Sequence, residues 1–393
     1  MNEKTDRTEK TEKLLKTIRT VLVIIMVIAI LTVSKAASSV SIRVLLSFFV
    51  FLLVLPLVSA MEKAKFPHWL ATIIATLVIV TVVAAFLWFV FFTVEMLMDT
   101  IPGYASRLEA LDKMAAGIAG KWVQLPEDFS LFSSLNVDWI GSLVMPGLRY
   151  VSSQAISILS NVLITILMTV FLLGERHVIV PKLINFATDR DGEKVAQIWD
   201  RIVRQISKYI SIKIFVSILT GMLFYLVAVI VKLDFALLWG VMAVVLNFIP
   251  TIGSIIITAL MILMAIIQFA PAIGPILFVA ISAVAIQNIV GNFLDPRLSG
   301  NTLNLSPFII LVGLGTFGFI WGIVGMFLAV PLLSVLQIIC ANIDATRPIA
   351  IMISSGRSYK HTINERNSRR RTTKKTSSQK ADYSDEFTFP DRQ

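Results

Sequence analysis

The chain has little charge and almost no cysteine. Charged residues make up 15% of its 393 residues and Cys340 is its one cysteine, whereas soluble domains carry about 25% charged residues. A single cysteine excludes an internal disulfide and a CxxC metal or redox motif. The sequence has no P-loop, no G-x-S-x-G and no H-E-x-x-H pattern, which are the signatures of ATPases, serine hydrolases and zinc proteases. We therefore expect no enzymatic activity, no metal and no cofactor.

Long hydrophobic runs dominate what is present. Hydrophobic residues make up 56% of the chain and the mean hydropathy is +0.82. A transmembrane helix needs about 20 mostly apolar residues. We predict an all-α polytopic membrane protein in the lipid bilayer with about eight hydrophobic segments, which form six crossings and two re-entrant helical hairpins.

Shifts in hydropathy and charge divide the chain into successive parts. We expect a basic cytoplasmic N-terminus (1–19), transmembrane helices 1–3 (20–94), an extracytoplasmic amphipathic segment (95–148) and transmembrane helix 4 (149–174). These are followed by a cytoplasmic amphipathic linker that lies on the membrane surface (175–209), a transmembrane transport core (210–340) and a basic disordered cytoplasmic tail (341–393).

Two stretches of the core predict hairpins. The apolar runs Phe235–Ile249 and Ile252–Gln268 are each short for a crossing and are joined at Pro250. They form either a re-entrant hairpin or two short spans. A glycine-rich run from Pro307 to Leu336 predicts the second hairpin.

Polar side chains end the apolar run that begins at Ala280. Gln287, Asn288 and Asn292 occupy its last turns and Asp295 follows. On an α-helix, positions 288, 292 and 295 share one face. Polar groups at membrane depth are costly and usually face a cavity or another helix. We therefore expect this face to line a transport path.

Asp295 and Arg297 flank a proline that ends the helix. A buried carboxylate without a partner costs several kcal/mol or takes up a proton. Pairing with Arg297 is the interpretation we favour for Asp295. The alternative is that Asp295 exchanges a proton or binds a cation as substrate passes.

The glycines of the last apolar run predict close helix packing. Gly318 and Gly322 form a G-x-x-x-G pair, and Gly325 and Pro331 follow in the same run. Small residues allow helix backbones to approach closely. We expect these positions to pack helices together within the chain or within a homo-oligomer.

His68 precedes Trp69, at the start of the third hydrophobic run. No second histidine or cysteine lies near it in the sequence. We therefore interpret His68 as a residue of the membrane interface rather than a metal ligand.

The stretch Tyr209–Gln337 carries a family resemblance. The pattern Q-N-x-x-x-N-x-x-x-P-x-x-x-G-x-x-L-x-L-x-P, then W-G-x-x-G-M-F-L-A-V-P, resembles the autoinducer-2 exporter-like family, also called PerM-like permeases. The earlier run LLWGVMAVVLNFIPTIGSII is similar to the family's N-x-I-P-x-x-G stretch, and this resemblance adds Asn247, Pro250 and Gly253 to the expected transport path. Lys213 departs from the Gly-Gln pair usual near this point, which weakens a site role at this end.

The resemblance implies a bacterial plasma-membrane transporter that exports a small polar organic molecule such as an autoinducer-2-like signal. A sodium/proton antiporter is the alternative within transport, and a non-transporting membrane scaffold is the alternative outside it. Proton or sodium is the expected coupling ion.

The distribution of charge predicts the orientation in the membrane, since basic residues concentrate on the cytoplasmic side. The tail has nine basic residues and one acidic residue between Arg357 and Lys380, and we expect it to contact anionic lipid rather than nucleic acid. Residues 95–146 contain seven acidic and three basic residues and are expected outside. Both termini are then cytoplasmic. Reporter fusions at Gly120 and in the tail should report opposite sides; the same side for both would contradict this topology.

Overall fold

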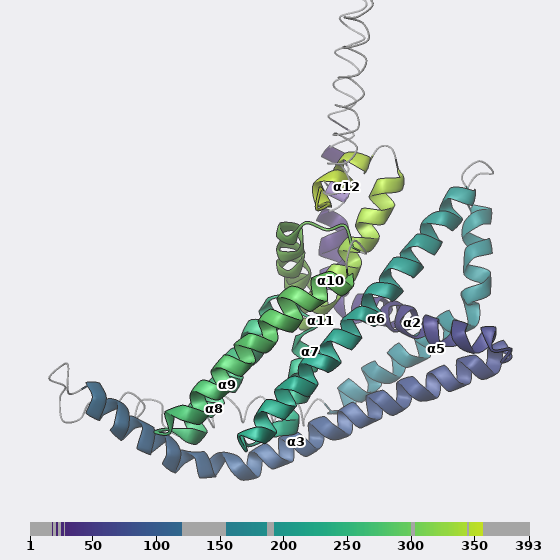
Figure 1. Ribbon diagram of the computed structural model, residues 1–393. Coiled ribbons are helices and arrows are strands. Elements are labelled where there is room, and N and C mark those ends of the chain that lie inside the picture. Colours follow the sequence, from purple (N-terminus) through teal and green to yellow (C-terminus); the bar gives the residue numbers. More distant parts are fainter. Residues whose placement is uncertain are drawn as a thin grey trace, which may run out of the picture.

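The computed structural model describes residues 18, 21–22, 25–26, 28–119, 155–186, 192–299, 303–343 and 346–356. All regular secondary structure in these ranges is helical (Figure 1). The helices are α2 Ser38–Lys63, α3 His68–Ala119, α5 Ala155–Phe186, α6 Gly192–Ile230, α7 Ala236–Leu246, α8 Ile252–Phe269, α9 Ile273–Ile286, the π-helix η1 Gln287–Leu294, α10 Asp295–Ser299, α11 Pro307–Asn342 and α12 Arg347–Ile353.

Most of these helices have the length and composition of membrane spans. Within the described residues, seven helical stretches meet both conditions: Ser38–Lys63, His68–Leu97, Ser157–Ile179, Gly192–Ile230, Ile252–Phe269, Ile273–Ser299 and Pro307–Asn342. Large apolar side chains such as Trp88 and Phe171 are exposed on them, as expected of helices that face lipid. The predicted all-α polytopic membrane fold is confirmed. The number of crossings stays a prediction.

Two expected segment boundaries lie inside continuous helices. Helix α3 continues beyond residue 94 to Ala119, so the third span and the start of the predicted extracytoplasmic segment are one helix. Helix α6 likewise joins the predicted linker to the fifth span across residue 209 (Figure 1). The rest of the predicted extracytoplasmic segment, nearly all of the N-terminal segment and most of the tail lie outside the described residues.

The first half of α6 is part of a buried core. Ile202, Ile206 and Tyr209 are buried with residues of α2, α3, α5 and α11, and this group is called the first core. The Ser207 hydroxyl donates a hydrogen bond of 2.9 Å to the Leu52 carbonyl of α2. The apolar face of this half of α6 therefore packs against protein, although its segment was predicted to lie on the membrane surface.

A second core forms around the other half of α6. Phe224 of α6 is fully buried with residues of α7, α8 and α9, which include Ile257 and Val279. Close approach of α6 and α7 requires glycine, because a Cβ at Gly221 would lie 2.6 Å from the Gly240 carbonyl oxygen. Helices α8 and α9 lie side by side (Figure 1).

The first predicted hairpin is present as α7 and α8. Asn247 follows α7, and Thr251, with φ 64°, precedes α8. A Cβ at Gly253 would lie 1.7 Å from the Leu246 carbonyl oxygen, so the turn needs glycine there. Re-entry of this pair into the membrane stays a prediction.

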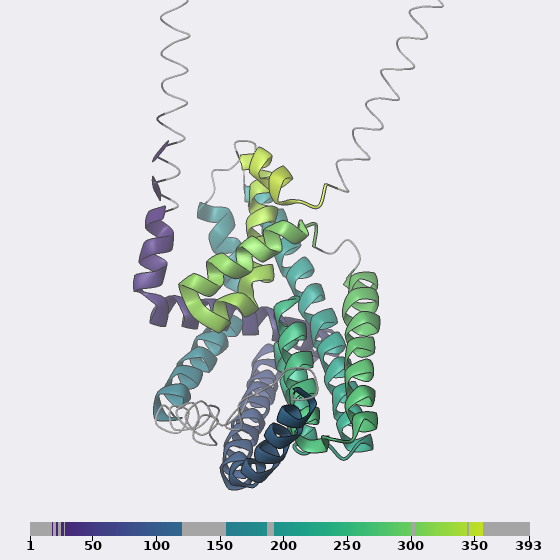
Figure 2. The ribbon, with the colours of Figure 1, turned by 90° about the vertical axis from the view of Figure 1, so that its left-hand side faces the viewer.

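The second predicted hairpin is present within α11. Gly322 has φ 63° and ψ −142°, which breaks the helix, and Figure 2 shows the two halves of α11 doubled back on each other. Contacts across the fold are tight, since a Cβ at Gly325 would lie 1.9 Å from the Phe317 carbonyl oxygen and one at Gly318 would lie 2.9 Å from Met326 Cγ.

The predicted G-x-x-x-G face is therefore wrong. Gly322 is the turn of the hairpin and not a helical packing position, because its backbone conformation lies in a region that residues with a Cβ rarely occupy. Gly318 and Gly325 do pack closely, but against the opposite half of the same hairpin. Pro331 is buried in the second half of α11.

The turn can be tested with two glycine-to-alanine variants. A Cβ at Gly322 or at Gly315 would meet no atom within 4 Å, so the two sites differ in backbone conformation and not in space. Gly322→Ala should destabilise the fold by about 1–3 kcal/mol through backbone strain. Gly315→Ala, in a regular helix, should be neutral or stabilising by up to about 1 kcal/mol. Thermal unfolding in detergent measures both, and equal midpoints would contradict the strained turn.

Candidate functional site

A cavity of about 790 Å³ adjoins the first core, and Tyr209 and Val330 of that core are among its lining residues. Its walls come from α6, the α7–α8 hairpin, the α9–η1–α10 helix, residues 303–307 and α11. Of the residues expected along the transport path, the cavity is lined by Asn247, Pro250, Gln287, Asn288, Asn292 and Asp295. Gly253 and Arg297 are not among its lining residues.

The polar wall of the cavity is a π-helix. Helix α9 is regular and apolar as far as Ile286, and η1 begins at Gln287, where the polar residues begin. π-helical turns are rare and occur often at functional sites. The α-helical spacing argument placed Asn288, Asn292 and Asp295 on one side, and all three do line the cavity, although the backbone between them is not α-helical.

The two asparagines are linked along this wall. The Asn292 amide donates a hydrogen bond of 3.1 Å to the Asn288 side-chain oxygen, and the Asn288 amide donates one of 2.9 Å to the Val284 carbonyl. Both side chains are exposed. They therefore present polar groups to whatever fills the cavity.

Gln287 has a buried amide without a partner. Neither its side-chain nitrogen nor its oxygen has a hydrogen-bond partner among the described residues, and the same is true of the Thr258 hydroxyl on the α8 side of the cavity. A buried polar group left unsatisfied costs about 1–3 kcal/mol. Gln287, a residue of the cavity wall, thus has a donor and an acceptor that the described residues do not use.

Asp295 forms an ion pair with Lys213 and not with Arg297. Lys213 Nζ lies 3.0 Å from Asp295 Oδ2, and the Ser299 hydroxyl donates a hydrogen bond of 3.0 Å to Asp295 Oδ1. Arg297 instead lies 3.8 Å from the centre of the Phe293 ring. The favoured Asp295–Arg297 pairing is wrong, because residues two apart on a helix point to different sides.

Lys213 is the site residue that the sequence argument missed. Its side chain is 6% exposed and lines the cavity from α6 together with Tyr209. A lysine within an apolar span is a signal of function by itself, since such residues are costly in a membrane. Its departure from the family pattern had led us to expect little there.

Asn247 has a structural contact as well as a place in the cavity wall. It is buried, and its side-chain amide donates a hydrogen bond of 3.0 Å to the Ser217 hydroxyl of α6. This bond fixes the end of α7 against α6.

Comparison with known proteins identifies relatives along most of the chain. The AI-2E family transporter profile matches residues 22–345. Two relatives, each named "Putative transport protein", are 29% identical to this chain. The one from Haemophilus influenzae matches over 83% of this chain and 93% of its own length. The one from Borreliella burgdorferi matches over 67% of this chain and 70% of its own length. The AI-2 transport protein TqsA of Escherichia coli K12 is 26% identical over 81% of this chain and 90% of its own length.

The Lys213–Asp295 pair can be tested through an asymmetry in its two single variants. Asp295→Asn leaves the Lys213 side chain, which is 6% exposed, buried without a counter-charge. This should lower the free energy of unfolding by about 3–5 kcal/mol. Lys213→Met should cost less, because Asp295 is 20% exposed and keeps its bond from Ser299. The double variant should recover most of the loss.

The control is Asp200→Asn in the surface pair Arg204–Asp200, whose side chains are 68% and 55% exposed. Removing this pair should lower the free energy of unfolding by at most about 0.5 kcal/mol. Thermal unfolding midpoints compare the four variants. Additive losses in the Lys213–Asp295 double variant would contradict a stabilising pair.

Proposed function

Because the chain belongs to the AI-2E transporter family, shown by the match over residues 22–345, we propose that it is a secondary transporter that moves a small polar organic molecule through the cavity beside η1. Membrane transport follows from the family. The substrate class and the path are our proposal, and an autoinducer-2-like signal is the substrate that the name of the Escherichia coli relative suggests.

The observation that carries the proposal is the unsatisfied amide of Gln287. Its nitrogen can donate and its oxygen can accept a hydrogen bond, which suits a hydroxyl- or carbonyl-bearing molecule. The cavity volume of about 790 Å³ falls within the range of about 300–1,000 Å³ typical of small-molecule sites. Asn288 and Asn292 add further amide groups on the same wall.

Two breaks in helical structure border the cavity. Pro250 and Thr251 lie in the turn between α7 and α8, and residues 303–306 precede α11. Transporters often place their binding sites at such breaks, where the backbone can change conformation. These segments are the parts of the wall that we expect to move during transport.

A sodium/proton antiporter is the second candidate, and the Asp295 carboxylate on the cavity wall is the observation that supports it. A carboxylate on a cavity wall can bind a cation or a proton if the neighbouring ammonium moves away. Asp295→Asn would then abolish ion exchange.

The two candidates separate in proteoliposomes that contain the purified full chain. Gradient-driven flux of autoinducer-2 and sodium/proton exchange are measured on the same preparation. For the organic substrate, Gln287→Leu should lower flux by about 5- to 150-fold, because one lost hydrogen bond in a buried site is worth about 1–3 kcal/mol. Asn288→Leu and Asn292→Leu should lower flux as well.

Stability distinguishes a substrate contact from a structural role. Gln287→Leu removes a buried polar group without a partner, so it should leave the unfolding midpoint unchanged or raise it while flux falls. Asn342→Leu is the control, since Asn342 lies at the end of α11 and its amide bonds to the Ile338 carbonyl. Unchanged flux in Gln287→Leu would contradict the proposed path, and exchange without organic flux would favour the antiporter. Neither activity would favour a scaffold.

A further inference from the structure

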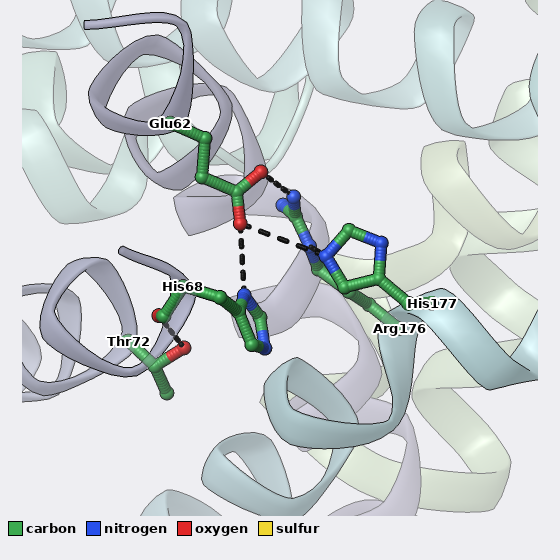
Figure 3. Close-up of polar contacts among 5 residues, drawn as sticks. All are labelled: Glu62, His68, Thr72, Arg176 and His177. Carbon is green, nitrogen blue, oxygen red and sulfur yellow. Dashed lines mark hydrogen bonds and ion pairs between the residues drawn. The ribbon is translucent and has the colours of Figure 1, made fainter. Parts of the chain in front are cut away.

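Three side chains that can bind metal meet at one end of the bundle. Glu62 lies near the end of α2, His68 is the first residue of α3, and His177 lies on α5 (Figure 3). One ligand atom from each lies within 4.8 Å of the other two. His68 Nδ1 is 2.8 Å and His177 Nε2 is 3.6 Å from the same carboxylate oxygen, Glu62 Oε1.

Arg176 holds the other side of this carboxylate. Its guanidinium pairs with Glu62 Oε2, so Oε1 is the oxygen that faces the two imidazoles (Figure 3). Arg176 Nε also donates a hydrogen bond of 3.1 Å to His177 Nε2. An accepting Nε2 is unprotonated, and this is the form of a ring nitrogen that binds a metal.

The structure removes one premise of the sequence interpretation of His68 as a residue of the membrane interface. That interpretation rested on the absence of a second histidine nearby in the chain, but α5 brings His177 next to it, with ring centres 4.8 Å apart. An ion pair between Glu62 and Arg176 accounts for one carboxylate oxygen. The other oxygen lies within hydrogen-bond distance of His68 Nδ1, at 2.8 Å, and 3.6 Å from His177 Nε2, which is too long for a hydrogen bond.

We propose that Glu62, His68 and His177 form a binding site for a single Zn²⁺ ion that links α2, α3 and α5. Two imidazole nitrogens and one carboxylate oxygen are a known zinc ligand set, which leaves a fourth position for water. Nitrogen ligands disfavour Mg²⁺ and Ca²⁺, which prefer oxygen. Arg176 supports the site by orienting the ligating carboxylate through its second oxygen.

Binding requires small movements. Zn²⁺ takes ligands at about 2.0–2.2 Å, so the three atoms must close around the ion and His177 Nε2 must exchange its bond from Arg176 for the metal. His68 Nδ1 binds in the tautomer protonated at Nε2. His177 is 60% exposed, which leaves its ring free to turn.

The consequence is a metal-dependent link among helices of the first core. The segment 64–67 connects α2 to α3, whereas α5 reaches the site from more than 100 residues away along the chain. A ligand that binds the folded state stabilises it. The unfolding midpoint should therefore rise with Zn²⁺ concentration.

The test uses the full chain, purified without a polyhistidine tag and freed of metal with chelator. Calorimetric titration with Zn²⁺ should give one ion per chain. His177→Gln, His68→Gln and Glu62→Gln should each weaken binding by at least about tenfold, since even partners of metal ligands contribute that much. The chain has three histidines. The third, His361, lies outside the described residues, and His361→Gln is the matched control with unchanged affinity.

His177→Gln is the decisive variant, because an exposed side chain can be changed without loss of the fold. Equal Zn²⁺ affinity in His177→Gln and the unaltered chain would overturn the proposal, as would no binding by the unaltered chain. A rise in unfolding midpoint with Zn²⁺ in the unaltered chain and His361→Gln, but not in His177→Gln, would support it. None of these measurements depends on transport.

Discussion

Two polar bridges from α6 hold the cavity together, and the rest of the structure depends on them. Lys213 and Ser217 lie four residues apart, so they share one face of the helix. Lys213 pairs with Asp295 of α10, and Ser217 accepts a hydrogen bond from Asn247 at the end of α7. Because an unpaired charge or polar group is costly in a membrane protein, these contacts hold α10 and the end of α7 against α6. The helix itself is anchored in both cores, through Ile206 in the first and Phe224 in the second.

The remaining polar groups of the cavity differ from these bridges. Among the described residues, Gln287 has no partner, and the exposed amides of Asn288 and Asn292 bond to each other and to the Val284 carbonyl of α9. A group that stabilises the fold is expected to be satisfied, whereas a group that binds a passing molecule must be available when the molecule arrives. The absence of a partner thus separates Gln287 from the structural polar residues of this cavity, and exposure separates Asn288 and Asn292 from them.

Local patterns in the sequence predicted the apolar helices, both hairpins and most of the polar wall, since hydropathy, Pro250 and the run of polar residues from Gln287 are properties of adjacent positions. The contacts between distant residues could not be predicted in this way. Lys213 and Asp295 are 82 residues apart, and only the packing of α6 against α10 brings them together. His68 and His177 meet for the same reason. Gly322 was misplaced because a glycine in an apolar run can be a packing position or a turn, and only the backbone conformation distinguishes the two.

The charge balance of the cavity favours a neutral polar substrate over a cation. Asp295 and Lys213 cancel each other at 3.0 Å, so the wall has no net charge from this pair and an uncharged molecule can bind beside it without breaking it. A cation could bind Asp295 only by displacing a lysine that is 6% exposed, and this lysine would then be buried without a partner. Transport of the organic molecule that we propose requires no such displacement.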